Sequence, residues 1–223
     1  MPVPDNTYFG EKPEGGGIHY KEVREIRDEQ RSLLVLKSRV DTLLIRQVNE
    51  LSIKNEDGGY KIWSPFALAV LTFLAIETVG HIINDVQKIK AENDNEQSKL
   101  IVTPVYLLMD KNLSYKPSKK IYEGFEKLHG REDKKSIKRY SDVIHKYQRN
   151  TFNHGYQARG VYLSHKPIEP WIILESEGYL IINPYLFWGL FKNTYESIFE
   201  QILKKQNEEW RRNALQYLKH LLS

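Results

Sequence analysis

The side chains best suited to chemistry lie within one ten-residue stretch, YQRNTFNHGY, on a segment whose pattern is otherwise helical. Arg149 and His154 are its central pair, with Asn150, Asn153 and Tyr156 close beside them in the sequence. An arginine can hold an anionic phosphate, and a histidine with its usual pKa of about 6.5 can move protons at neutral pH. Groups gathered this closely suit the binding and cleavage of a phosphodiester.

The same stretch overlaps the end of a basic segment of the chain. From Lys111 to Arg149 there are 12 Lys and Arg residues against 5 Asp and Glu, a net charge of +7 on 39 residues, whereas the whole chain carries +4. We interpret this segment as an electrostatic site for a polyanion, with Lys138, Arg139 and Lys146 as candidate contacts. A helix face that is merely solvated would have the same composition, and that alternative stays open.

Composition excludes several classes of function. The chain has no cysteine, which removes disulfides, cysteine-ligated zinc and thiol nucleophiles and fits a reducing compartment, so the cytoplasm is the expected location. The N-terminus lacks the basic and apolar regions of a secretory signal. No HExxH motif, Asp-x-Asp pair or phosphate-loop sequence is present, so neither a metal ion nor another cofactor is expected.

Apolar spacing predicts helices that follow a flexible arm. Residues 1–17 lack apolar periodicity and end in three glycines, which is typical of a flexible segment. From about 20 to 53, apolar residues recur at helical steps and predict one long amphipathic helix. Its expected core seam is Ile26, Leu33, Leu36, Val40, Leu43 and Leu51.

A second predicted helix, apolar nearly all round, begins at Ser64-Pro65 and runs to about Ile83. Glu77 and His81 interrupt the apolar run, so we favour a central bundle helix over a membrane span and expect no membrane partner. These two side chains lie four residues apart on one face. They can form a purely structural pair or give polar support to a catalytic site.

The next part of the chain combines a predicted insertion with the helix that carries the YQRNTFNHGY stretch. Residues 92–131 are expected to interrupt the core, with a strand or short helix at 102–108 and a short helix at 118–128. A long helix is then predicted from Lys134 to about Tyr156.

In the C-terminal part of the chain, the residue pattern changes from that of helices to that of strands. β-Branched and aromatic runs predict a hairpin at about 168–183, and Asn183-Pro184 opens a last long helix that breaks near Asn207 before a terminal helix. The fold class is therefore all-α, an up-and-down bundle of about four core helices with a small β-hairpin inserted before the last long helix. Residues 18–223 are expected to form one domain.

Arg149-Asn150, then His154 and Tyr156, resemble the signature of HEPN domains (higher eukaryotes and prokaryotes nucleotide-binding), many of which are metal-independent endoribonucleases. The resemblance covers mainly residues 134–156. It implies a helical bundle, a homodimer that brings two motifs into one groove, and RNA cleavage by attack of a ribose 2′-hydroxyl. The form of the motif with a tyrosine two residues after the histidine resembles HEPN toxins that are paired with nucleotidyltransferase antitoxins. This resemblance implies an antitoxin or other regulatory partner in stress or phage defence.

On this resemblance, His154 would be the general acid/base, and Arg149 would bind the scissile phosphate and stabilise its growing charge. Asn150 and Asn153 would orient neighbouring groups, and Tyr156 would be an auxiliary hydrogen-bond donor. Lysines and arginines of the basic segment would contact RNA, and DNA, which lacks the 2′-hydroxyl, would not be cleaved.

Several alternatives remain open at the level of sequence. The chain could be a catalytically inactive HEPN-like module that binds nucleotide or RNA or mediates assembly, or a helical interaction protein whose polar motif is only surface. His154 could cap the end of its helix before Gly155. The looser family spacing also recurs from Arg139 to His145.

Overall fold

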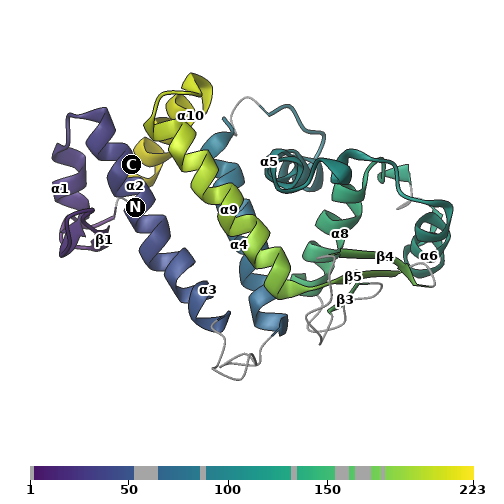
Figure 1. Ribbon diagram of the computed structural model, residues 1–223. Helices are drawn as coiled ribbons and strands as arrows, with labels where there is room; N and C mark the ends of the chain where they lie inside the picture. The colour runs from purple at the N-terminus through teal and green to yellow at the C-terminus, as the bar shows by residue number, and fades with distance from the viewer. Residues whose placement is uncertain are drawn as a thin grey trace.

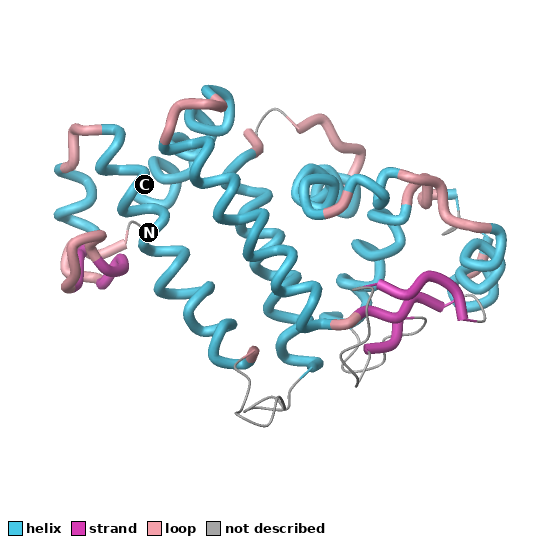
Figure 2. Tube along the Cα trace, in the orientation of Figure 1, coloured by secondary structure: helices cyan, strands magenta, loops and turns pink. Residues whose placement is uncertain are grey.

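The computed structural model describes residues 3–52, 65–85, 89–131, 135–153, 161–163, 172–176 and 179–223, with only the backbone described at 147–153 and along most of the C-terminal strands. The fold is an all-α bundle with small β elements, as the sequence predicted (Figures 1 and 2).

The helices follow one another along the chain from α1 to α10. They are α1 (Tyr20–Glu25), α2 (Glu29–Val40), the π-helical turn η1 (Asp41–Ile45), α3 (Arg46–Leu51), α4 (Pro65–Ile83), α5 (Asp94–Met109), the 3₁₀ turn η3 (Lys111–Ser114), α6 (Lys119–His129), α8 (Tyr140–Asn153), α9 (Pro184–Leu203) and α10 (Glu208–Leu222). The strands are β1 (Tyr8–Glu11), β2 (Gly17–His19), β3 (Val161–Leu163), β4 (Ile172–Ser176) and β5 (Tyr179–Ile182).

Helix α4 is the central helix and packs against α9, α5 and α10. By length and composition it is the one helix of the described residues that could cross a membrane, and 56% of its apolar window is buried inside the protein. Packing against three other helices accounts for its apolar composition. The predicted role as a central bundle helix is therefore confirmed.

Helix α9 lies alongside α4 over much of its length (Figure 1). Asn183 caps it, because its Oδ1 accepts hydrogen bonds from the backbone N–H groups of Tyr185 and Leu186 at 3.1 and 3.3 Å, and Pro184 follows at the first helical position. The start of α9 at Pro184 and the break between α9 and α10 near Asn207 are as predicted. The buried stripe of α9 is rich in aromatic residues and consists of Tyr185, Phe187, Trp188, Phe191, Thr194, Tyr195, Ile198, Phe199 and Ile202.

The single helix predicted from 20 to 53 is wrong, because the chain breaks between α1 and α2. Ile26 takes an extended conformation, and the Asp28 carboxylate accepts the N–H groups of Gln30 and Arg31 at 3.2 and 3.0 Å to begin α2. Asp28 is therefore a helix N-cap within the segment that the apolar period treats as continuous.

The π-helical turn η1 alters which side chains reach the core. A π turn adds one residue to the helical repeat, so the buried face shifts along the sequence by one position. Leu43, predicted in the core seam, is 46% exposed, whereas Ile45 and Val48 are 5% and 0% exposed. The seam prediction is correct for Leu33, Leu36 and Val40, and it is wrong at Ile26, which lies at the break, and at Leu43.

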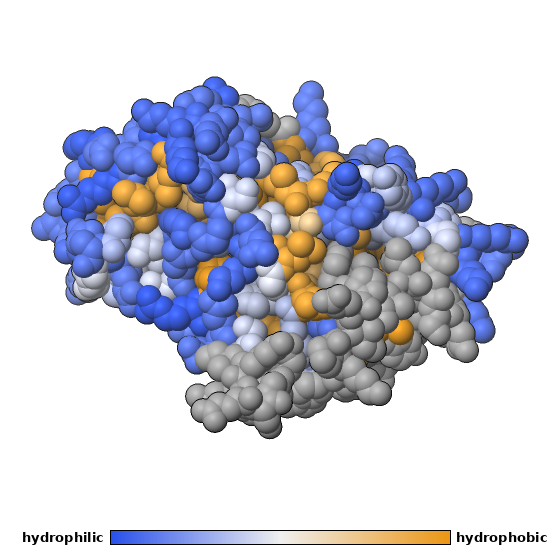
Figure 3. Space-filling view, viewed as in Figure 1, coloured by the Kyte–Doolittle hydropathy of each residue, from blue (hydrophilic) through white to orange (hydrophobic). Residues whose placement is uncertain are grey.

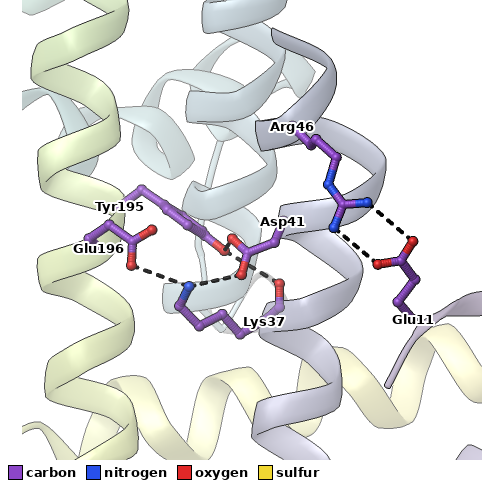
Figure 4. A network of polar contacts seen from close by, with 6 residues as sticks. All are labelled: Glu11, Lys37, Asp41, Arg46, Tyr195 and Glu196. Carbon is purple, nitrogen blue, oxygen red and sulfur yellow. Dashed lines mark hydrogen bonds and ion pairs between the residues drawn. The ribbon is translucent and has the colours of Figure 1, made fainter. Parts of the chain in front are cut away.

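Polar contacts link this turn to α9. The Tyr195 hydroxyl donates to Asp41 Oδ1 at 2.6 Å, and the Lys37 ammonium lies 2.9 Å from Asp41 Oδ2 and 3.2 Å from Glu196 Oε2 (Figure 4). Burial raises the pKa of the Tyr195 phenol far above its ordinary range, and the Asp41 carboxylate raises it further. The network fixes α2 against the middle of α9.

The N-terminal segment forms a hairpin where a flexible arm was predicted. Strands β1 and β2 pair antiparallel, and the fully buried Phe9 ring lies under the Arg39 guanidinium at 4.4 Å. Arg46 and Glu11 form an ion pair at 3.0 Å between α3 and β1 (Figure 4). Burial of Phe9 outweighs the low apolar content of the segment, so the prediction of an arm is wrong for residues 8–17.

Helix α5 belongs to the core, which corrects the predicted insertion at 92–131. Pro104 lies inside it, where the sequence predicted only a strand or a short helix at 102–108. The helix continues through this proline because it buries Ile101, Val102, Val105, Tyr106 and Met109. The short helix at 118–128 is confirmed as α6, with Ser118 as its N-cap.

The predicted hairpin is confirmed as β4 and β5, which pair antiparallel. The sequence missed β3, which pairs parallel to β5 and gives a three-stranded sheet in the order β3-β5-β4. Parallel pairing joins segments that are distant in sequence, so no local turn signal announces it. The sheet lies between α6 and α9 in the view of Figure 1, and β5 contacts α6.

Candidate nucleic-acid interface

Helix α8, which carries the motif, begins at Tyr140 and not at the predicted Lys134. Asp142, its third residue, accepts hydrogen bonds from the backbone N–H groups of Lys138 and Arg139 at 2.7 and 2.9 Å. The carboxylate thus satisfies amide groups that a helix start leaves without partners. Ile137, predicted in the helical seam, is buried but precedes the helix.

A lysine from α5 fixes this helix start. Lys99 Nζ donates a hydrogen bond to the carbonyl of Ser136 at 3.0 Å. It also forms an ion pair with Asp142 Oδ1 at 3.1 Å, and the geometry of this second contact is not that of a hydrogen bond. The Asp142 side chain is 2% exposed. The core helix α5 therefore sets the position of the segment that leads into α8.

Three of the predicted site residues belong to the last turns of α8, where the structure describes the backbone. Arg149 and Asn150 are three and four residues beyond Lys146, and Asn153 is the last residue of the helix. At 1.5 Å per residue, Arg149 lies about 14 Å along the axis from Tyr140. The side chains of these three residues, and all of His154 and Tyr156, lie outside the described residues.

A basic groove lies at the opposite end of α8, between α6 and the segment that precedes Tyr140. It has a volume of about 1240 Å³. Its charged lining is Lys116, Lys119, Glu123, Glu126, Arg131, Lys135 and Lys138. Hydrophilic side chains cover the α6 end of the molecule (Figure 3). Among the described residues of the lining, five cations against two carboxylates give a net positive charge.

The two carboxylates of the groove already have cationic partners. Glu126 lies 2.8 Å from Arg131, and Glu123 lies 3.6 Å from Lys119. Within the described part of the chain, the ammonium groups of the other three lysines have no carboxylate at ion-pair distance; these are Lys116, Lys135 and Lys138. Three positive charges are therefore available to an anionic ligand.

Hydrogen bonds hold the two walls of the groove in place. The Tyr140 N–H donates to the Tyr115 carbonyl at 3.0 Å, and its hydroxyl accepts the Ser118 N–H at 3.2 Å. The Tyr122 hydroxyl donates to the Ile137 carbonyl at 3.0 Å. The start of α8 and the start of α6 are thus one connected unit.

The three predicted RNA contacts fall in different environments. Lys138 lines the groove. Arg139 lies 3.6 Å from the buried Asp142 carboxylate, and Lys146 Nζ lies 5.6 Å from the centroid of the Phe125 ring on α6. Of these three residues, only Lys138 lines the groove. Lys146 lies on α8 between Tyr140 and Arg149, with its ammonium group over an aromatic ring of α6.

The structure separates Arg139 from His145, the second pair with a looser family spacing. Arg139 precedes α8, whereas His145 is the sixth residue of that helix. His145 is 7% exposed, and Arg139 is paired with Asp142. Arg139 therefore has a structural role and His145 is buried, which leaves the spacing of Arg149 and His154 as the candidate motif.

Glu77 and His81 lie on α4, and within the described residues no hydrogen bond or ion pair links them. Burial raises the pKa of the Tyr106 phenol, and the charge of Glu77 raises it further. His81 lines a small cavity of about 160 Å³ between α4 and α10, together with Asn213 and His220. The two predicted supporting residues therefore have separate surroundings.

Sequence reasoning identified Lys138 but not the other members of the groove. The signal for them was the net charge of +7 between Lys111 and Arg149. Their convergence depends on how α6 packs against the segment before α8, which composition does not encode. Tyr122, the aromatic residue of the lining, had no signal of its own.

Comparison of the chain with protein-family models, with curated proteins and with solved structures found no match in any of the three. Among the residues that the structure describes, no group of three or more His, Asp or Glu side chains is placed to hold a metal ion.

Proposed function

We propose that the protein is a HEPN-type, metal-independent endoribonuclease that cleaves RNA by attack of the ribose 2′-hydroxyl on the adjacent phosphate. The observation that carries the proposal is the position of the motif. Arg149 and Asn150 occupy the last turns of a helix in an all-α bundle, and that same helix begins at the wall of a basic groove. A polyanion in the groove can reach the motif along α8.

The chemistry follows from the residue types in the motif. The His154 imidazole would remove the proton of the 2′-hydroxyl or protonate the departing 5′-oxygen. The Arg149 guanidinium would bind the phosphate and stabilise the extra charge of the transition state, since it donates two hydrogen bonds in a fixed geometry. Asn150 and Asn153 would orient these groups, and Tyr156 would donate a further hydrogen bond. The nucleophile belongs to the substrate, so the reaction needs no cofactor.

The proposal includes partners and a location. RNA is the substrate, and a homodimer would bring two copies of the motif into one cleft, since one helix cannot surround a phosphate. A cognate antitoxin or other regulatory protein would restrain the activity, in a toxin or phage-defence setting. The cytoplasm is the proposed site of action. Sedimentation of the purified protein tests the dimer.

Cleavage of total RNA in EDTA tests the activity. The wild-type protein should leave 2′,3′-cyclic phosphate and 5′-hydroxyl ends, because attack by the 2′-hydroxyl produces them. His154→Ala and Arg149→Ala should each lower the rate by at least about 100-fold, within the usual range for loss of an acid/base or of charge stabilisation. His220→Ala and Arg212→Ala on α10 are matched controls, because they remove the same residue types at exposed positions.

A second candidate is a catalytically inactive HEPN-like module that binds RNA or nucleotide. It is favoured by the distance of about 14 Å along α8 between the groove and Arg149, since binding in the groove does not require the motif. Intact RNA after incubation with the wild-type protein, together with retained RNA binding, would favour this module. Equal cleavage by wild type and His154→Ala would reject His154 as the acid/base.

A further inference from the structure

The charges of the groove define how many phosphates it can contact. Lys119 and Arg131 are already engaged by the groove carboxylates, at 3.6 and 2.8 Å. Lys116, Lys135 and Lys138 remain, and Lys135 and Lys138 are exposed in the segment that precedes α8. A polyanion in this groove would therefore displace counterions from about three phosphates.

An aromatic ring lies in the lining of the same groove. Tyr122 is half-buried, and its hydroxyl donates to the Ile137 carbonyl at 3.0 Å, which fixes the orientation of the ring. The Lys116 ammonium lies 6.0 Å from the ring centroid. A fixed ring with a cation nearby is the arrangement on which proteins stack the bases of single-stranded nucleic acids.

A carboxylate in the lining favours a single strand over a duplex. The Glu123 side chain is 61% exposed and keeps acceptor sites beyond its contact with Lys119, because a carboxylate has about four. Such acceptors suit the amino groups of bases, which a duplex engages in base pairs. A purely electrostatic surface for a duplex backbone would gain nothing from carboxylates in its lining.

We propose that the groove between α6 and residues 135–138 binds a single-stranded segment of the RNA substrate, with Tyr122 stacked on a base and three lysines on consecutive phosphates. The proposal deepens the nuclease function and rests on it for the identity of the ligand as RNA. Tyr140 and Arg149 lie about 14 Å apart along the axis of α8, so the bound segment would flank the scissile bond. The enzyme would then require a single-stranded flank and not only a cleavable linkage.

Binding should be measured in the full-length His154→Ala variant, so that the RNA stays intact. The probes are a fluorescein-labelled 12-nucleotide single-stranded RNA and the duplex of the same sequence, in EDTA, between 0.05 and 0.3 M NaCl. For three phosphate contacts on a single strand, the plot of log K against log salt should have a slope of about −2. The duplex should bind more weakly at every salt concentration.

A triple variant tests the three lysines. Lys116→Ala, Lys135→Ala and Lys138→Ala together should weaken binding about 50-fold at 0.15 M salt and bring the slope close to zero, since each contact contributes about fourfold under the same counterion relation. The control removes the same charge at exposed sites on α1 and α10, by Lys21→Ala, Arg212→Ala and Lys219→Ala. The control should bind like the parent.

Substitution of the ring tests stacking. Tyr122→Phe keeps the ring and should bind within about twofold of the parent, whereas Tyr122→Leu should bind about tenfold more weakly. The inference is overturned when the lysine triple variant binds like its control, when Tyr122→Leu binds like Tyr122→Phe, or when the duplex binds as tightly as the single strand. Absence of cleavage by the wild-type protein would reject the nuclease and leave these binding results unaffected.

Discussion

Lys99 on α5 places its ammonium group 3.1 Å from the carboxylate of Asp142 on α8, and that carboxylate also accepts the backbone N–H groups of Lys138 and Arg139. One buried side chain thus joins a core helix, the start of the motif helix and the wall of the basic groove. Changes at this contact should affect both stability and RNA binding.

Asp142→Ala should lower the free energy of unfolding by about 2–3 kcal/mol, because it leaves two amide groups without their acceptor and removes the ion-pair partner of the partly buried Lys99 ammonium. Asp142→Asn should cost less, since the amide oxygen still accepts. Urea unfolding measures both, and the affinity for single-stranded RNA should fall with the loss of the groove wall. An Asp142→Ala protein as stable as the wild type would show that the helix start does not depend on this carboxylate.

Two helical glycines should respond in opposite directions to alanine. A Cβ at Gly80 of α4 would lie 2.6 Å from the Ile101 carbonyl oxygen of α5, whereas a Cβ at Gly189 of α9 meets no atom within 4 Å. Gly80→Ala should therefore destabilise the protein by about 1–3 kcal/mol, because α4 and α5 must move apart. Gly189→Ala should stabilise it by about 0.5–1 kcal/mol through helix propensity.

Thermal unfolding of the two glycine variants provides the comparison, with each variant serving as the control for the other. Since α5 carries Lys99, Gly80→Ala should also weaken RNA binding, while Gly189→Ala should leave it unchanged. Equal melting temperatures for the two variants would contradict the close approach of α4 to α5.

The π-helical turn predicts unequal costs for two neighbouring apolar residues. Ile45→Ala should cost about 2–4 kcal/mol because Ile45 is 5% exposed, and Leu43→Ala should cost less than about 0.5 kcal/mol because Leu43 is 46% exposed. Chemical denaturation of both variants measures the difference. The reverse order would mean that α2 continues as a regular α-helix, with Leu43 in the core.

The features that the sequence predicted correctly have local signals. Ser118, Asn183 and Asn207 each cap a helix through their own side chain, so the starts of α6, α9 and α10 could be read from the residues themselves. The apolar composition of α4 was sufficient because that helix is buried against three others.

The features that the sequence missed depend on distant contacts. Pro104 remains inside α5 because the apolar face of that helix is buried, and Leu43 is exposed because a π turn shifts the register. The candidate site shows the same difference between local and distant signals. The spacing of Arg149 and His154 can be read from the sequence. The groove depends on packing of α6 against the segment before α8, which local patterns do not specify.

Alkaline pH should destabilise the protein through the buried Tyr195. Burial and the adjacent Asp41 carboxylate raise the pKa of its phenol above the ordinary value of 10. A raised folded-state pKa gives stability that is present below pH 10 and lost above it, because the unfolded chain then releases the phenol proton while the folded protein retains it. The free energy of unfolding should fall by up to about 1.4 kcal/mol per pH unit from this group.

Tyr195→Phe removes that pH dependence and the hydrogen bond to Asp41 at 2.6 Å. At pH 7 the variant should be less stable by about 1 kcal/mol, yet its stability should decline less steeply than that of the wild type between pH 10 and pH 11. Denaturant unfolding across this range measures both effects. Tyr115→Phe is the matched control, because Tyr115 is 59% exposed and should keep the wild-type slope. Parallel slopes for wild type and Tyr195→Phe would show that the Tyr195 phenol ionises equally readily in the folded and unfolded protein.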